Sequence, residues 1–250
     1  MCAATLRPLR VSAETPSSLP AWFDAWGAVL RAHVDSRGRV DFASIAREPD
    51  PLYGVVRFVN AISPDNRPDL FPTLAHRIAY DIDSYNALAM FGVVRAGIPE
   101  RLGLLARARF FLFSSFLIGG RGISLEDYEN IKIRPLGEER VHFALNCMVR
   151  GCPRLPREPF RPEQLEGQLA AAAREFCDDG RNVRPDPASR SLWLSSIFRF
   201  YTKDFVPAKA ANLAAYVNRW RTQPPVPEDY TVRFLDYDWT INIQPGGPSA

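Results

Sequence analysis

The sequence predicts an α+β fold, in which a single mainly helical domain packs on a small mixed or antiparallel sheet. Most apolar residues recur at the three- and four-residue spacing of amphipathic helices, whereas the candidate strands are few and short. Helices and strands also lack the regular alternation of a doubly wound parallel sheet. With 46% apolar residues over 250 positions, the chain can form a proper core, which excludes a disordered protein.

The helices follow from this spacing and from their end signals. The first is predicted from Ala21, where Trp22, Trp26 and Leu30 share one face, and Gly38 marks its stop before a short extended Val40-Asp41-Phe42. Further helical patterns cover residues 52–62, 74–80, 84–94, 162–177 and 209–220. The 84–94 helix is apolar on nearly all sides and is therefore expected at the centre of the core.

The strands are predicted from dense apolar runs that end in turns. Residues 110–118 precede the glycine-rich turn 119–122, which indicates a strand, a tight turn and a short return strand. Ser124 with Asp127 three residues on is typical of a helix start, and Ser195 or Ser196 can cap another. Two further strands are predicted at 192–194 and 231–241.

The two ends of the chain lack periodicity. Residues 1–20 and 244–250 are expected to be flexible tails, which leaves 21–243 as a single globular domain. The start Met1-Cys2-Ala3-Ala4-Thr5 fits an ordinary cytoplasmic protein and equally a processed lipoprotein that begins at Cys2. A periplasmic or cell-envelope location and a cytoplasmic one therefore both stay open. No apolar stretch is long enough to span a membrane.

Charge and motifs exclude several functional classes. Lys+Arg 31 against Asp+Glu 28 leaves +3, too small an excess to predict a nucleic-acid partner. No phosphate-binding glycine loop or G-x-S-x-G elbow is present. Cys147, Cys152 and His142 lack the usual zinc spacing and a fourth ligand, so neither a metal nor a cofactor is indicated. A small molecule, a peptide or another protein remains as the partner.

The remaining candidates for a nucleophile and a base lie in the segment from Arg140 to Pro153. A thiolate nucleophile needs a nearby base or imidazolium, and a third group to orient it. Neither a helical nor an extended register pairs His142 with Cys147, and only a loop that folds back brings Cys152 towards the imidazole. Buried cysteines are also common small hydrophobes, and a loop of this length can close a local disulfide.

Several separated motifs resemble the domain of unknown function 547 family, over about Val40 to Asn242. The resemblance rests on residues 85–87, 123–129, 140–147, 152–153, 194–198, 204–205 and 237–242. It implies a common fold and a shared polar cluster, without a settled activity, and many bacterial members carry export signals. This chain departs from relatives at Asp81 and Asp83, where a Trp and an Asn are usual, and at Asn130, where a His is usual. If that His were a catalytic acid or base, this member would be impaired.

Two hypotheses follow. In the first, the chain is a thiol hydrolase or acyltransferase, with Cys147 as nucleophile and Cys152 as second choice, and with His142 as base. Glu129 or Asp238 would orient His142, and Asn86 or Asn146 would stabilise an oxyanion. The remaining candidates, expected to bind substrate or to support the site, are Tyr85 and Arg134; Glu129 and Arg134 are also expected to form a buried salt bridge.

In the second hypothesis the chain is a monomeric, non-catalytic binding or scaffold module with a Cys147–Cys152 disulfide. Thiol redox exchange ranks last because Cys-x4-Cys lacks the helix-start placement of reactive pairs.

Overall fold

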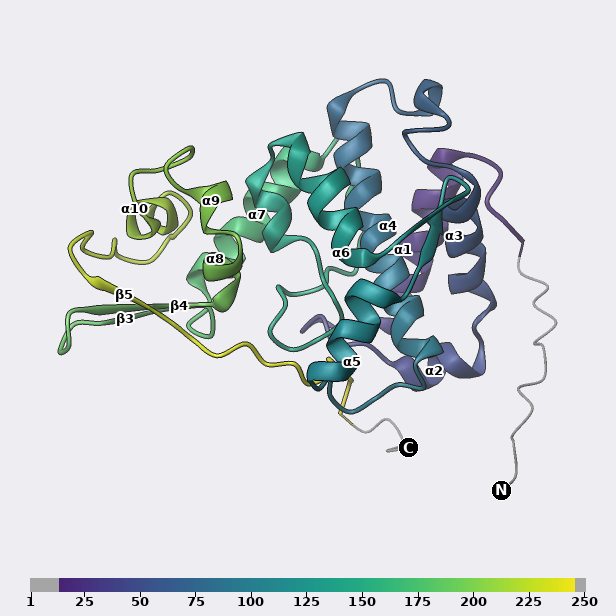
Figure 1. Ribbon diagram of the computed structural model, residues 1–250. Coiled ribbons are helices and arrows are strands. Elements are labelled where there is room, and N and C mark those ends of the chain that lie inside the picture. The colour runs from purple at the N-terminus through teal and green to yellow at the C-terminus, as the bar shows by residue number, and fades with distance from the viewer. Residues whose placement is uncertain (1–13, 246–250) are drawn as a thin grey trace.

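The structure, a computed structural model, describes residues 14–245 (Figure 1). It confirms the α+β class, because helices dominate and two small sheets accompany them. One sheet has two antiparallel strands; the other has three, with β3 antiparallel to β4 and β4 parallel to β5. The larger sheet is therefore mixed, which is one of the two alternatives that the sequence leaves open.

The long helix α4 (Leu74–Arg95) forms the centre of the molecule. Thr73 caps its start, and the helix runs without interruption through the two segments predicted as separate helices. Every residue from Ile78 to Met90 is buried, which confirms the predicted central position. α1 (Leu19–His33), α2 (Phe42–Arg47) and α3 (Asp50–Ala61) pack around it and complete the larger hydrophobic core.

The apolar run that begins at Phe110 is only partly a strand. α5 (Leu104–Ala108) continues into a single π-helical turn, η2 (Arg109–Phe113), and only Phe116–Ile118 forms strand β1. The return strand β2 spans Arg121–Ile123, as expected. An apolar run alone does not separate a strand from a buried helical turn, and here Phe110 anchors η2 in the core.

The chain then passes through a series of short helical turns. α6 (Leu125–Asp127) begins at Ser124, whose hydroxyl accepts the Asp127 N–H at 3.0 Å, as predicted. The next turns are η3 (Tyr128–Ile133), η4 (Arg134–Leu136) and η5 (Glu139–Phe143). The segment that carries His142 is therefore a 3-10 turn, which is neither the helix nor the strand considered from the sequence.

The C-terminal half builds the mixed sheet and its covering helices. These elements are α7 (Leu165–Asp178), β3 (Val183–Asp186), β4 (Ser191–Leu194), α8 (Ser196–Phe200), α9 (Thr202–Phe205), α10 (Leu213–Asn218) and β5 (Thr231–Phe234). The predicted strand 231–241 ends at Phe234, because the chain then leaves the sheet. It crosses the molecule as an extended segment, drawn in yellow, to reach the helical half (Figure 1).

This extended segment ties distant parts of the chain together. Thr240 pairs with Arg101, Ile241 with Val149, and Ile243 with Val40. Gln244, which the sequence assigned to the tail, donates from its side chain to the carbonyls of His33 and Arg39 at 3.0 and 3.1 Å. At the other end α1 begins at Leu19, and the tails predicted at residues 1–13 and 246–250 lie outside the described residues.

Two hydrophobic clusters meet at η5. The larger surrounds α1, α3 and α4 and includes Val141, whereas the smaller lies between α7, α8 and α10 and includes Phe143. Two residues of one short turn, on either side of His142, therefore belong to different cores. His142 and the cysteine loop that follows lie at this junction.

Candidate functional site

A cavity of about 640 Å³ opens where the two clusters meet. This volume is within the range of about 300–1,000 Å³ that is typical of small-molecule sites. Its walls come from α4, α5, η2, α6, η3, η5, α8 and the extended segment after β5. The predicted residues that line it are Tyr85, Glu129, Arg134, His142, Cys147 and Cys152. The structure therefore brings the thiols and the imidazole to one cavity.

The two cysteines lie sulfur to sulfur. Their Sγ atoms are 2.7 Å apart, and the backbone N–H of Cys147 donates to the Sγ of Cys152 at 3.0 Å. The Tyr237 hydroxyl lies 3.2 Å from the Cys152 sulfur and 3.7 Å from that of Cys147. Both cysteines are free thiols in the structure, so the formation of a local disulfide stays a prediction.

Hydrogen bonding separates the acidities of the pair. Burial raises the pKa of Cys152, but hydrogen bonds from the Cys147 thiol, the Tyr237 hydroxyl and backbone N–H groups outweigh burial and lower it. The hydrogen bond with Cys152, together with burial, raises the pKa of Cys147 well above its ordinary value. Cys152, the second choice from the sequence, is therefore the more acidic thiol of the pair.

His142 is held by carboxylates rather than by a thiol. Its Nε2 lies 2.7 Å from Asp204 Oδ2, its Nδ1 lies 3.6 Å from Glu129 Oε1, and its ring stacks on Tyr201 with centroids 3.8 Å apart. Burial lowers the pKa of His142, but the hydrogen bond to Asp204 and the negative charges of Glu129 and Asp204 outweigh burial and raise it. Within residues 14–245 no hydrogen bond joins His142 to either cysteine. These contacts fix the position of the imidazole on the cavity wall and favour its protonated form.

Arg134 pairs with Asp204, which corrects the expected salt bridge with Glu129. Its Nε and Nη2 donate to the two oxygens of Asp204 at 2.7 and 2.8 Å. Glu129 instead accepts a hydrogen bond from the Tyr85 hydroxyl at 3.5 Å and lies beside His142. The planar guanidinium matches both carboxylate oxygens of Asp204 at once, which one distant oxygen of Glu129 does not offer.

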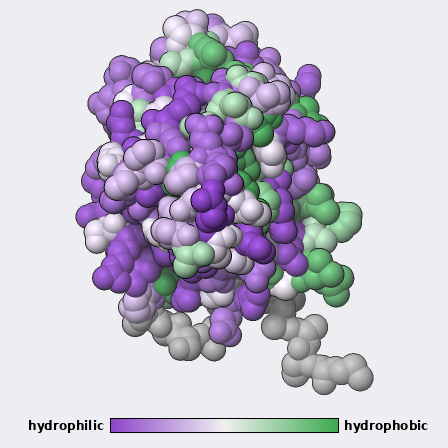
Figure 2. All heavy atoms as spheres, turned by 90° about the vertical axis from the view of Figure 1, so that its left-hand side faces the viewer, coloured by the Kyte–Doolittle hydropathy of each residue, from purple (hydrophilic) through white to green (hydrophobic). Residues whose placement is uncertain are grey.

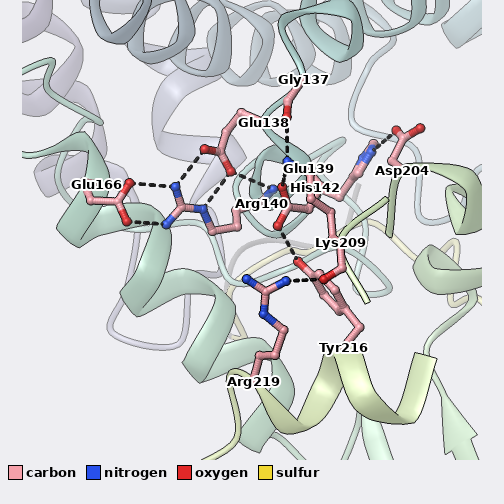
Figure 3. A network of polar contacts seen from close by, with 10 residues as sticks. All are labelled: Gly137, Glu138, Glu139, Arg140, His142, Glu166, Asp204, Lys209, Tyr216 and Arg219. Atoms are coloured by element: carbon pink, nitrogen blue, oxygen red, sulfur yellow. Dashed lines mark hydrogen bonds and ion pairs between the residues drawn. The ribbon is translucent and has the colours of Figure 1, made fainter. Parts of the chain in front are cut away.

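A network behind His142 fixes the turn that carries it (Figure 3). Arg140 donates to both Glu138 and Glu166 through four bonds of 2.7 Å, which ties η5 to α7. On the other side Glu139 accepts from Tyr216 at 3.2 Å and pairs with Lys209 at 3.1 Å. The backbone on both sides of His142 is therefore anchored before the imidazole meets Asp204.

Asn86 and Asn146 hold the cysteine loop and are not among the residues that line the thiol cavity. Asn86 donates to the Ala144 carbonyl at 3.0 Å and accepts the Asn146 N–H at 2.7 Å. Asn146 donates to the Pro153 carbonyl and accepts the Met148 N–H, both at 2.7 Å. Both amides are fully buried and are used by the backbone. They therefore position the loop, as the structural interpretation of a buried mid-helix Asn predicts.

Asp238 lies outside the thiol cavity. Its carboxylate accepts the Thr240 N–H at 2.9 Å and so closes a turn in the extended segment. Its side chain is exposed, and it does not touch His142. The capping role considered from the sequence is the one that the structure shows.

The three departures from relatives fall in different places. Asn130 lies on the wall of the thiol cavity, so the residue usual in relatives would add an imidazole there. Asp81 instead lines a separate cavity of about 170 Å³, where burial raises its pKa to about 7. Asp83 accepts from the Trp26 indole at 3.1 Å in the core. Only one of the departures therefore concerns the candidate site.

Four contributors to the site were not proposed from the sequence. Asp204, Tyr237 and Trp239 stand in the motifs that carry the family resemblance, which was the available signal. Tyr201 lies between two of those motifs and had no further signal. Within residues 14–245 no group of three or more His, Cys, Asp or Glu is arranged to hold a metal ion.

Fold and site together define a mainly helical α+β protein with a paired-thiol cavity. Residues 73–177 match the family described as "Protein of unknown function, DUF547", which confirms the resemblance over this segment. The match includes α4, the Ser124 cap, the His142 turn and both cavity cysteines, but not Asp204 or Tyr237. No curated protein and no solved structure matches the chain.

Proposed function

We propose that the chain is a cysteine-dependent acyl-transfer enzyme, either a hydrolase or an acyltransferase. The observation that carries this proposal is the environment of one sulfur. Cys152 accepts a backbone N–H and lies beside a thiol and a phenol, inside a cavity of substrate size. Donors that stabilise the thiolate are what a thiol needs to act as a nucleophile near neutral pH.

The chemistry is assigned as follows. The Cys152 thiolate attacks the carbonyl carbon of an acyl substrate, the leaving group departs with its electron pair, and a thioester forms. Water or another acceptor then takes the acyl group, and Glu129 on the same wall accepts its proton. His142, kept cationic by Asp204, supports the negative charge that develops in the cavity. In this assignment His142 does not act as the base for the thiol.

The test combines thiol reactivity with trapping of the acyl-enzyme. The intact protein is treated with iodoacetamide across a pH series, and each modified cysteine is identified by peptide mapping. We expect Cys152 to react at lower pH than an ordinary thiol, and Cys152→Ser to abolish this early reaction. A second series offers p-nitrophenyl acetate, butyrate and dodecanoate, with an acyl adduct on Cys152 expected by mass spectrometry.

Two variants act as controls. Cys147→Ser retains a donor to the Cys152 sulfur, so we expect it to keep the adduct and to shift its pH dependence. Cys177→Ser replaces a buried thiol outside the cavity and is expected to leave reactivity unchanged. An adduct yield that is equal in wild type and Cys152→Ser would overturn the assignment.

The close sulfur contact also favours the second candidate, a non-catalytic binding module. At 2.7 Å the two Sγ atoms need to approach by less than about 1 Å to reach the length of a disulfide bond. In that case the purified protein is two mass units lighter than its reduced form and is not alkylated at Cys147 or Cys152 without a reductant. Rapid alkylation of Cys152 in the untreated protein excludes this candidate.

A further inference from the structure

The segment at the mouth of the thiol cavity exposes unusually large apolar side chains. Leu104 is 75% exposed, Leu105 86%, Leu112 51% and Phe113 78%. These four residues, all from α5 and η2, are called here the α5–η2 rim. Exposed apolar residues are common singly, but four within ten positions form a patch that calls for a partner.

The rim stands out from the surface rather than lining a groove in it. Figure 2 shows apolar groups protruding at the lower right-hand edge, the side on which Figure 1 places α5. Leu105 and Phe113 line none of the cavities described above, so they are not part of a cleft wall. A protruding apolar group is suited to insertion into a soft phase such as a lipid layer.

The charges along the chain segment that carries the rim are mostly positive, whereas Glu126 and Glu129 lie on the wall of the adjoining cavity. Residues 95–115 contain four arginines, Arg95, Arg101, Arg107 and Arg109, but only one acidic residue, Glu100. Within residues 14–245, Arg101, Arg107 and Arg109 form no ion pair with a carboxylate. Unpaired arginines beside apolar side chains are typical of proteins that bind anionic lipid surfaces.

The rim is continuous with the cavity. Leu104 and Leu112 belong to both, since each is more than half exposed and each lines the cavity wall. Arg107 lies between them in the wall, with its guanidinium 4.5 Å above the Trp239 ring. An acyl chain that left a lipid layer at the rim would therefore meet apolar side chains along its way to the thiols.

We infer that the α5–η2 rim docks on an anionic lipid surface and directs lipid acyl groups into the thiol cavity. The docking part stands on the exposed rim and its arginines alone, whereas the substrate class, acyl lipids, rests on the proposed function. A second copy of this chain is a poorer occupant, because an isologous contact would place the arginines of the two rims against each other. No helix of residues 14–245 is long and apolar enough to cross the membrane, so the inferred contact lies at its surface.

The test of docking is co-sedimentation of the full chain with vesicles. One set contains phosphatidylcholine alone, and the other contains phosphatidylcholine with phosphatidylglycerol. We expect binding to the phosphatidylglycerol vesicles, weakened by salt. Leu105→Ser with Phe113→Ser should reduce the partition coefficient about tenfold or more, because two large side chains no longer insert. Arg101→Gln and Arg109→Gln should each reduce it about fivefold.

The control variant is Leu74→Ser. Leu74 is 53% exposed at the start of α4, far from α5 in Figure 1, so its loss should leave vesicle binding unchanged. Circular dichroism and thermal melting confirm that each variant is folded. Equal sedimentation of wild type and the Leu105→Ser/Phe113→Ser variant would overturn the inference. So would a dimer in solution that this variant converts to a monomer, because the rim would then be covered by a second copy.

The substrate class has its own readout. With p-nitrophenyl dodecanoate as probe, phosphatidylglycerol vesicles should raise the rate severalfold for wild type and not for the rim variant. The short acetate ester should be cleaved equally by both, since Leu105 and Phe113 are outside the cavity. Vesicle binding by a protein that forms no acyl adduct refutes the proposed function and the substrate class but not docking. An adduct without vesicle binding refutes docking alone.

Discussion

Replacement of Asp204 by Asn tests whether His142 is held as a cation. Asp204 accepts three charged hydrogen bonds, two from Arg134 at 2.7 and 2.8 Å and one from His142 at 2.7 Å. Each such bond is worth about 1.5–3 kcal/mol, but Asn retains one acceptor oxygen and the site is partly open to solvent. We therefore expect Asp204→Asn to lower the free energy of unfolding by about 3 kcal/mol at pH 6.

The decrease in the free energy of unfolding caused by Asp204→Asn should become smaller as the pH rises. The folded-state pKa of His142 is raised above its ordinary value of 6.5, so its contribution is complete below 6.5 and is lost as the pH rises through the folded-state pKa. Wild type therefore loses this contribution as the pH rises from 6.5 through the folded-state pKa, whereas Asp204→Asn has little of it to lose. Other groups with shifted pKa values, such as His33 and Asp81, are common to both proteins and cancel in the difference.

Urea unfolding followed by tryptophan fluorescence at several pH values gives both quantities. Glu158→Gln is the matched control, because Glu158 pairs with Arg31 at 2.7 Å but its side chain is 61% exposed. We expect the control to change the free energy of unfolding by less than about 0.5 kcal/mol at every pH. If Asp204→Asn behaves like this control, or if its deficit is the same at pH 6 and pH 9, His142 is not a cation stabilised by Asp204.

Three further predictions concern the parts that support the site. Asn86→Ala leaves the Ala144 carbonyl and the Asn146 N–H unpaired, so urea unfolding should show a free energy of unfolding that is lower by about 3 kcal/mol. A decrease below about 1 kcal/mol would contradict the positioning role. Gly38→Ala should lower the melting temperature more than Gly137→Ala. Both glycines have φ near +75°, but only the new methyl group at Gly38 would meet backbone, 2.7 Å from the Leu155 nitrogen. Equal shifts in melting temperature would argue against this contact. Cys177 should resist iodoacetamide at pH 8 in the native protein, because burial raises its pKa to about 12, and alkylation before unfolding would refute this.

The sequence predicts the parts of the fold whose signals are local. The Ser124 cap and the buried central helix follow from spacing and capping, which act within a few residues. The π-helical turn after Arg109 was not predictable, because a run of Phe and Leu satisfies a strand and a buried turn equally. The end of the strand predicted over residues 231–241 was not predictable either, because contacts with distant parts of the chain take it out of the sheet after Phe234.

The candidate site was predictable in its residue types but not in its pairing. His142, Cys147, Cys152 and Glu129 were identified, and all four line one cavity. The hydrogen bond between His142 and Asp204 joins residues 62 positions apart, and no local pattern in the sequence indicates such a contact. The preference for Cys152 likewise depends on Tyr237, which arrives from the far end of the chain.

The extended segment after β5 has a consequence for the order of folding. It brings Ile243 to Val40 and Tyr237 to the cysteine loop, so these contacts close chain loops that are among the longest in the protein. Closing long loops carries a large entropic cost and is expected to follow the formation of local helices. An early folding intermediate with α4 in place would therefore still lack the phenol beside Cys152, and its thiols would have ordinary reactivity until the last stage of assembly.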